Sequence, residues 1–362
     1  MRVAVLGGGN GSFAAAGDLA LAGHEVALWR REDSAVAAHL AAGGHVIVED
    51  FRGRHVARPR LVTADIAEAV RGAELIVCPT PATAHHDIAT RLAPHLATGQ
   101  VVFLPPGTFG SFLFAKAAHA AGNRAEVAFA ETGTLPWLTR KHGPFEAAIT
   151  IRAKRLPTGV FPLRLSEPAL AVISRAFPGV IEACGDALSA SLLNAGPIIH
   201  PPLIIMNAAP LEHFERWDIH NEGTQPAVRR VTDALDAERI ATRQALGYSG
   251  PHFPLANHYA QEGEEWMYGR GSHDKLTQSG DWRERIVLTE HRYMLEDVGV
   301  GLSFLASVAR LAGVAAPLTV ALLALGSAVC GRNLLATGRT LATLGLGDLG
   351  VRDLKALLER GF

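Results

Sequence analysis

The chain has 362 residues, of which 48% are hydrophobic and 19% are charged, so it can bury a core and is not an intrinsically disordered sequence. At roughly 150 residues per domain, this length predicts two domains. The 34 Lys and Arg residues are balanced by 35 Asp and Glu residues, which argues against the positive excess typical of a nucleic-acid-binding protein.

The first third of the chain alternates strand-like runs with helical segments. A helical spacing over residues 13–22 follows a glycine turn, and near-continuous apolar runs occupy residues 3–6, 24–29, 75–78 and 101–104. Apolar strands separated by helices are typical of a parallel sheet covered on both faces. We therefore predict a doubly wound, Rossmann-type α/β domain over residues 1–187.

From about Ser189 the strand-like runs largely disappear. Helical stretches follow at residues 225–246, 281–298 and 301–331. This change predicts an all-α second domain over residues 188–362. A small ligand is expected between two such domains.

The stretch between Arg310 and Arg332 carries no charge and is long enough to cross a bilayer. It is built mainly from small residues, contains Pro317 and has no flanking aromatic anchors. We therefore expect a buried helix or a subunit interface and no membrane partner. Residues 311–331, which are rich in Ala and Gly, would suit a homodimer.

Three widely spaced cysteines and the absence of signal-peptide features at the N-terminus predict a cytoplasmic protein. Cys78, Cys184 and Cys330 form no CxxC pair, and the sixteen histidines are scattered. We expect neither a disulfide framework nor a metal site.

A glycine-rich turn, Gly7-Gly8-Gly9-Asn10-Gly11-Ser12, follows the first strand and opens the first helix. In a dinucleotide-binding turn the first glycine permits the sharp bend, and the second lets the backbone approach a pyrophosphate at the helix N-terminus. Ser12 stands at the usual third glycine. We assign Gly7, Gly9, Asn10, Gly11 and Ser12 to the cofactor.

The end of the second strand indicates which nicotinamide cofactor binds. Arg30 and Arg31 stand where NAD enzymes tend to carry an acidic residue, and guanidinium groups suit a 2′-phosphate. NADP(H) is therefore favoured. NAD(H) remains the alternative if Glu32 or Asp33 bends back to the ribose. Thr80 and Pro81, in the loop after residues 75–78, are also assigned to the cofactor.

Two segments of the second half carry candidate acid–base groups. His200 lies in an apolar stretch beside Pro201 and Pro202, which predicts an unusual fixed position, although a satisfied core histidine is the plainer interpretation. Arg292 and Glu296 have the spacing of an ordinary helical ion pair.

The chain resembles the opine dehydrogenase family, which includes octopine and nopaline dehydrogenases and the bacterial N-(1-carboxyethyl)norvaline dehydrogenase type. The motifs that carry the resemblance run nearly from end to end. They are the glycine turn with the following Leu19-Ala20-Leu21-Ala22-Gly23-His24, then Glu131-Thr132-Gly133-Thr134-Leu135-Pro136-Trp137, Ile198-Ile199-His200-Pro201, Asp236-Ala237-Glu238-Arg239, Arg292-Tyr293-Met294-Leu295-Glu296-Asp297-Val298 with Gly301-Leu302, and Gly338-Arg339-Thr340-Leu341.

The resemblance implies an NAD(P)H-dependent reductive condensation of an amino acid with an α-keto acid through an imine. His200 aligns with the family's catalytic histidine, and Asp297, rather than Glu296, aligns with its carboxylate partner. Arg292 aligns with the arginine that holds the keto-acid carboxylate. Thr134, with Thr132 as the second choice, matches a threonine of the same site.

Two departures from the family pattern leave the substrates open. Gly196 stands where relatives carry Asn, although Asn194 lies close by in the sequence. Thr108 replaces the Gln of some members. Asn194 and Thr108 are therefore assigned to substrate binding without naming the amino acid or the keto acid.

Two other functions are weighed. An NADP-dependent 2-keto acid, 3-hydroxy acid or ketopantoate-type reductase would need a catalytic lysine, and the chain offers Lys116, Lys141 and Lys275 without a supporting motif. A non-catalytic cofactor-binding protein would have no need for the acid–base and arginine residues at positions 200, 292 and 297.

Overall fold

The computed structural model describes all residues, 1–362, and divides into two compact units. The first unit contains Met1–Thr80, Ala84–Ser191 and Leu358–Phe362, and the second contains Pro81–Thr83 and Leu192–Leu357. We expected a boundary between residues 187 and 188. The first unit instead continues to Ser191. Two short segments, Pro81–Thr83 and Leu358–Phe362, belong to a different unit from the residues next to them in the sequence.

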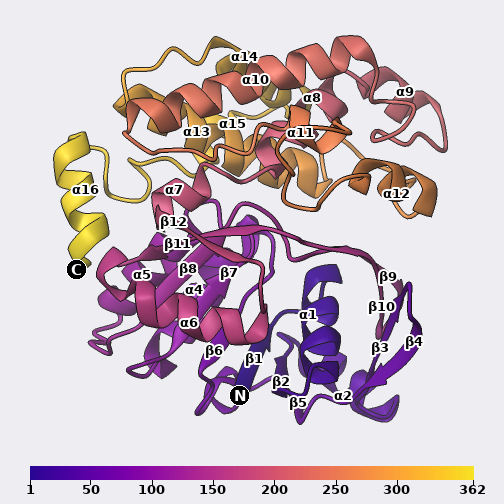
Figure 1. Ribbon diagram of the computed structural model, residues 1–362, viewed down its shortest axis with the longest axis vertical. Coiled ribbons are helices and arrows are strands. Elements are labelled where there is room, and N and C mark those ends of the chain that lie inside the picture. The colour runs from indigo at the N-terminus through magenta and orange to yellow at the C-terminus, as the bar shows by residue number, and fades with distance from the viewer. The chain divides into compact units, whose positions relative to one another are not determined.

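The first unit is built on an eight-stranded sheet with the order β12-β11-β8-β7-β6-β1-β2-β5 (Figure 1). Every pair of neighbouring strands is parallel except the pair of β8 and β11, which is antiparallel. The Rossmann-type fold is thereby confirmed. The strands are β1 (Arg2–Leu6), β2 (Glu25–Trp29), β5 (Leu61–Thr63), β6 (Leu75–Val77), β7 (Val101–Leu104), β8 (Ala128–Thr132), β11 (Leu156–Phe161) and β12 (Ile181–Asp186).

Seven helices and three 3₁₀ turns accompany this sheet. Helices α1 and α3 contact β1 and β2, whereas α5 and α6 contact β7, β8 and β11. The central strands are almost completely buried, as a parallel sheet with both faces covered requires. The elements are α1 (Asn10–Leu21), α2 (Asp33–Ala41), α3 (Ile66–Val70), η1 (Ala82–Ala84), α4 (His85–Leu92), η2 (Ala93–His95), α5 (Gly110–Ala120), η3 (Leu163–Leu165), α6 (Ser166–Ala176) and α7 (Ala187–Ser191).

A second sheet, which we did not predict, has the order β4-β3-β10-β9. Its strands are β3 (Val46–Asp50), β4 (Gly53–Ala57), β9 (Trp137–Gly143) and β10 (Glu146–Arg152). Helix α1 lies between the two sheets (Figure 1). This position explains why α1 is apolar on nearly all sides, because a helix covered all round has no solvent face.

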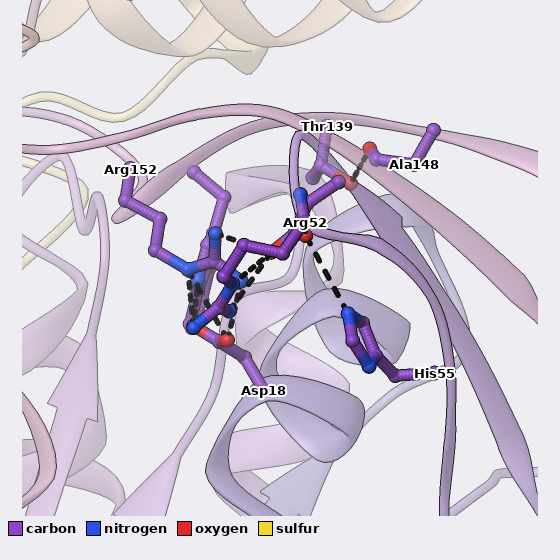
Figure 2. Close-up of polar contacts among 8 residues, drawn as sticks. Asp18, Arg52, His55, Thr139, Ala148 and Arg152 are labelled. Atoms are coloured by element: carbon purple, nitrogen blue, oxygen red, sulfur yellow. Dashed lines mark hydrogen bonds and ion pairs between the residues drawn. The ribbon is translucent and has the colours of Figure 1, made fainter. Parts of the chain in front are cut away.

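A cluster of ion pairs fastens α1 to the second sheet (Figure 2). Arg152 of β10 lies 2.7 Å from Asp18 of α1 and 2.8 Å from Asp50, which Arg52 also contacts at 2.9 Å. Burial alone would raise the pKa of Asp50, but the hydrogen bonds from Arg52 and Arg152 outweigh it and lower that pKa to about 2. The Asp50 carboxylate therefore contributes to stability in its charged form.

The second unit is helical, as predicted. It contains α8 (Gly196–Ile205), α9 (Ala208–His213), α10 (Pro226–Ala245), α11 (Ala256–Tyr259), α12 (Ser272–Ser279), the π-helix η4 (Tyr293–Leu302), α13 (Ser303–Leu311), α14 (Pro317–Cys330) and α15 (Leu334–Thr337). The last helix, α16 (Val351–Arg360), begins in this unit, and its last three residues belong to the first unit.

Two predicted helices of this unit have the wrong bounds. The helix expected over residues 281–298 begins only at Tyr293, because turns occupy the preceding residues. The helix expected over 301–331 is broken at residues 312–316, where Gly313 has a φ of 69° and Pro317 begins the next helix.

Helix α14, the core of the charge-free stretch, has 14 residues and exposes Val320 and Leu325 by 56% and 52%. The homodimer through this segment stays a prediction. A different helical stretch, Ala187–Ile205, is apolar enough and long enough to span a bilayer, but 72% of it is buried, and core helices commonly pass this test.

Candidate active site

The glycine turn lies at the carboxyl edge of the large sheet, where ligands of this fold bind. Gly7 has a φ of 116°, and a Cβ there would lie 2.6 Å from Ser12 Oγ and 2.8 Å from Thr80 Cγ2. A Cβ on Gly9 would meet no atom within 4 Å. Gly7 is therefore required by the bend, and Gly9 leaves room for a ligand against the backbone.

Helix α1 begins directly behind this turn, and no side chain caps its N-terminus. Its first N–H groups are therefore suited to an anionic pyrophosphate. Ser12 is fully buried, and its hydroxyl donates to the carbonyl of Leu6 at 3.2 Å. Asn10 Oδ1 accepts from the backbone N–H of Lys141 at 3.1 Å, which fixes β9 beside the turn.

Arg30 and Arg31 have different surroundings. The guanidinium of Arg30 lies over Gly8, where an added Cβ would be 3.2 Å from Arg30 Nε, and it stacks over Phe13. Arg31 lies farther out and forms an ion pair with Asp87 at 3.0 Å. Of the two arginines, Arg30 is thus the one held against the glycine turn.

Three more predicted residues follow neighbouring strands at the same edge. Thr80 comes after β6, Thr108 comes after β7, and Thr132 ends β8, and these strands are parallel neighbours. The Thr80 carbonyl is 3.1 Å from His85 Nε2, and the Thr132 hydroxyl donates to the carbonyl of Thr134 at 2.5 Å. Pro81 packs with the second unit.

The loop that carries Thr108 is held by a buried carboxylate that sequence reasoning passed over. Glu131 Oε1 accepts from the N–H of Phe109 at 2.8 Å, and Oε2 accepts from the N–H of Ser111 at 2.9 Å. Thr108 and Phe109 have φ values of 50° and 62°, which are uncommon for non-glycine residues. Burial raises the pKa of Glu131, although these hydrogen bonds oppose the shift.

In the second unit, His200 and Asp297 are brought into contact. His200 lies on α8 and Asp297 on η4, and His200 Nδ1 is 2.7 Å from Asp297 Oδ2. Their side chains are 13% and 6% exposed. A carboxylate at Nδ1 fixes the orientation and the tautomer of the ring.

The surroundings of this pair restrict the imidazole further. The Tyr293 ring stacks on His200 with 3.7 Å between ring centroids, a partner that we did not predict. Burial raises the pKa of Asp297 to about 7, although Arg292 and His291 oppose the shift.

The expected helical ion pair between Arg292 and Glu296 does not form. Glu296 Oε1 instead accepts from the backbone N–H of Ala82 at 2.8 Å. The Ala82 carbonyl accepts from Arg339 Nη2 at 3.1 Å, so both the N–H and the carbonyl of Ala82 are hydrogen-bonded to side chains. The exposed Arg292 packs over Tyr293, with 5.4 Å between its guanidinium carbon and the ring centroid.

The unusual Gly196 lies against the pair. A Cβ at position 196 would be 2.4 Å from Asp297 Oδ1, so the carboxylate occupies the space of a side chain. The nearby Asn194 is held to the same turn, because its Oδ1 accepts from the N–H of Gly196 at 3.1 Å. The predicted residues therefore form two groups, one at the sheet edge and one around the His200–Asp297 pair.

Comparison with known proteins agrees with both units. Residues 183–330 match the family described as NAD/NADP octopine/nopaline dehydrogenase, alpha-helical domain, and residues 2–105 match the NAD-dependent glycerol-3-phosphate dehydrogenase N-terminus. The chain is 29% identical to an opine dehydrogenase of Arthrobacter sp. (strain 1C), over 98% of each chain.

Two solved structures share the fold over nearly the whole length. An octopine dehydrogenase solved with NADH and agmatine has a TM-score of 0.76 at 19% identity and covers 99% of this chain and 98% of its own. A yersinopine dehydrogenase solved with NADP+ has a TM-score of 0.68 at 16% identity, covering 99% and 98%. The chain is therefore an NAD(P)-dependent oxidoreductase that is similar to opine dehydrogenases over nearly its whole length.

Proposed function

We propose that this protein condenses the amine of an amino acid with the carbonyl of an α-keto acid and reduces the resulting imine with NADPH, and that His200 and Asp297 are its acid–base pair. The observation that carries the proposal is the 2.7 Å contact between His200 Nδ1 and Asp297 Oδ2. The similarity to opine dehydrogenases indicates the class of reaction. The contact supports the assignment of His200 and Asp297 as the groups that transfer protons in that reaction.

The reaction requires proton transfers at two atoms. The amine nitrogen loses two protons as it forms the C=N bond, and the former carbonyl oxygen leaves as water. When bound, the reduced nicotinamide supplies the hydride that reduces the imine carbon, and the nitrogen takes up one proton. His200 can donate and accept at Nε2 near neutral pH, while Asp297 stabilises the protonated ring.

Arg292 is proposed to hold the keto-acid carboxylate. It forms no ion pair with a protein carboxylate, and it lies at the start of the helix that carries Asp297. A planar guanidinium can hold a carboxylate through two parallel hydrogen bonds. Thr134, Thr132, Thr108 and Asn194 are proposed to contact the substrates.

For the cofactor, we propose a preference for NADP(H) over NAD(H). The open space at Gly9 and the uncapped start of α1 fit a pyrophosphate. Arg30 Nε is buried and has no hydrogen-bond partner, so a cationic donor is available beside the turn. The alternative acidic ribose ligands, Glu32 and Asp33, are both exposed at the start of α2.

The lysine-dependent reductase is the weaker alternative. Lys275 is exposed on α12 and Lys141 lies over Phe13, whereas the contact between His200 and Asp297 provides an acid–base pair. Ketopantoate reductases share the fold at TM-scores of 0.59 to 0.60. Their likeness explains the architecture and does not identify the reaction.

The test is NADPH oxidation by the purified protein with amino acids and α-keto acids supplied singly and in pairs. We expect turnover only with a pair, and we expect His200→Ala to lower kcat about 100- to 10,000-fold. His213→Ala, at an exposed histidine of α9, is the control. Reduction of a keto acid alone, or full activity of His200→Ala, would refute the proposal.

A further inference from the structure

We infer that Lys141, on the second sheet, is a ligand of the cofactor's 2′-phosphate together with Arg30, and that Arg31 is not. This inference rests on the proposed preference for NADP(H). It assigns a role in the cofactor site to β9, which the sequence did not predict to be a strand.

Two cations converge on one aromatic ring at the glycine turn. The Lys141 ammonium lies 4.6 Å from the centroid of Phe13, and the guanidinium carbon of Arg30 lies 5.3 Å from the same centroid. Arg30 also packs at 5.9 Å from Phe145. The hydrogen bond from the Lys141 N–H to Asn10 Oδ1 at 3.1 Å holds the strand against the start of α1.

Neither cation is neutralised by the protein. Arg30 makes one hydrogen bond, from Nη1 to the carbonyl of Ala35 at 3.1 Å, and its Nε has no partner. Lys141 forms no ion pair. Nearby arginines behave differently: Arg31 pairs with Asp87, Arg54 pairs with Glu146, and Arg52 pairs with Asp50. Two unpaired, half-buried cations of like charge are what an anionic ligand would stabilise.

The electrostatics of the two groups favour an anionic ligand. Burial and the charge of Arg30 lower the pKa of Lys141, and burial lowers the pKa of Arg30. A phosphate between them would remove the repulsion and replace lost hydration with charge-assisted hydrogen bonds. A 2′-phosphate is the expected anion, because Arg30 follows β2 and lies over Gly8, the place of the adenosine ribose in this fold.

The strand ladder that carries Lys141 is irregular at the next residue. On β9 and β10, Lys141 pairs with Ala147 and Gly143 pairs with Glu146, so the ladder is irregular beside His142. A bulge of this kind re-aims the neighbouring side chains. Strand β9 is therefore irregular next to Lys141.

The experiment measures binding and kinetics of Lys141→Met, which keeps an apolar stem over Phe13, with Lys141→Arg as the conservative variant. Calorimetry with 2′,5′-ADP and 5′-AMP reports the phosphate contact without turnover. We expect Lys141→Met to weaken 2′,5′-ADP and raise KM for NADPH about 10- to 100-fold, with little change for 5′-AMP or NADH. Lys141→Arg should retain most of the affinity.

Arg31→Met tests the exclusion of Arg31: it should change neither cofactor's KM by more than a few fold, and a larger rise for NADPH would overturn that exclusion. Lys154→Met, at an exposed lysine that follows β10, is the matched control. If the wild-type protein prefers NADPH and Lys141→Met binds 2′,5′-ADP normally, this inference is wrong while the proposed cofactor stands. If the wild-type protein prefers NADH, the proposed cofactor preference itself fails. An equal loss for NADPH and NADH would indicate a general structural role for Lys141 and would also overturn the inference.

Discussion

Replacing Gly196 by Ala tests whether the His200–Asp297 pair acts as the structure suggests. The added methyl carbon would lie 2.4 Å from Asp297 Oδ1, whereas ordinary contacts begin near 3.4 Å. The carboxylate must therefore retreat by about 1 Å, the difference between these distances. We expect this displacement to disturb the 2.7 Å contact between Asp297 Oδ2 and His200 Nδ1, because both carboxylate oxygens move together.

A misplacement of this size in a catalytic group costs about 100-fold in rate. We expect Gly196→Ala to lower kcat by about that factor, to leave the binding of NADPH unchanged, and to keep the fold. Steady-state kinetics, calorimetric NADPH binding and circular dichroism measure the three effects. The control is Gly350→Ala, because a Cβ on Gly350 would meet nothing within 4 Å.

The result that would refute this reasoning is a Gly196→Ala protein with a kcat within about three-fold of the wild-type value, a change of roughly 0.6 kcal/mol in the barrier. Asp297 would then tolerate displacement, and the contact with His200 could not be the arrangement that moves protons. A loss shared equally by Gly350→Ala would show that the assay reports stability instead.

Two further predictions concern Arg292 and Asp50. Arg292→Lys should raise KM for the α-keto acid about ten-fold or more with a smaller change in kcat, because an ammonium cannot hold a carboxylate through two parallel bonds; an unchanged KM with the keto acid varied would contradict the assignment. Asp50 has a pKa of about 2 when folded against 3.8 ordinarily, so its charge contributes about 2 kcal/mol above pH 5, and this contribution is lost as the pH falls through 3.8 toward 2. In urea unfolding, the stability difference between wild type and Asp50→Asn should shrink by roughly half from pH 7 to pH 3, and a constant difference would count against the ion-pair cluster.

Several elements could be predicted from the sequence because their signals are local. The strand, glycine turn and helix at the N-terminus are specified by a buried apolar run, by residues that permit the bend and by helical spacing. Helix α10 agrees with the predicted stretch at residues 225–246 to within one residue at each end, because its proline start and amphipathic pattern are local too. The pairing of His200 with Asp297 was implied by the family resemblance, and the two side chains are in contact at 2.7 Å.

The second sheet illustrates what was missed and which signal could have found it. Helix α1 carries apolar or small residues on nearly every side, and Phe13, Ala14, Ala15 and Ala16 are all fully buried. One sheet covers only one side of a helix, so an all-apolar helix at the surface of a doubly wound domain indicates a second covering layer. Strand β3 pairs with β10 about a hundred residues later, and such non-local pairing leaves no periodic trace.

The sequence by itself determined the first strand and helix, the glycine turn between them and the resemblance to opine dehydrogenases, because each depends on neighbouring residues or on motifs in a fixed order along one chain. The family resemblance had implied the pairing of Asp297 with His200, but only the tertiary structure decided the surroundings of the other charges: Glu296 with Ala82, Arg31 with Asp87, while Arg30 and Lys141 share Phe13. The physical reason is that the energy of a charge depends on its distance to other charges and on its exposure to water. Both quantities are set by packing between segments that are far apart in the chain.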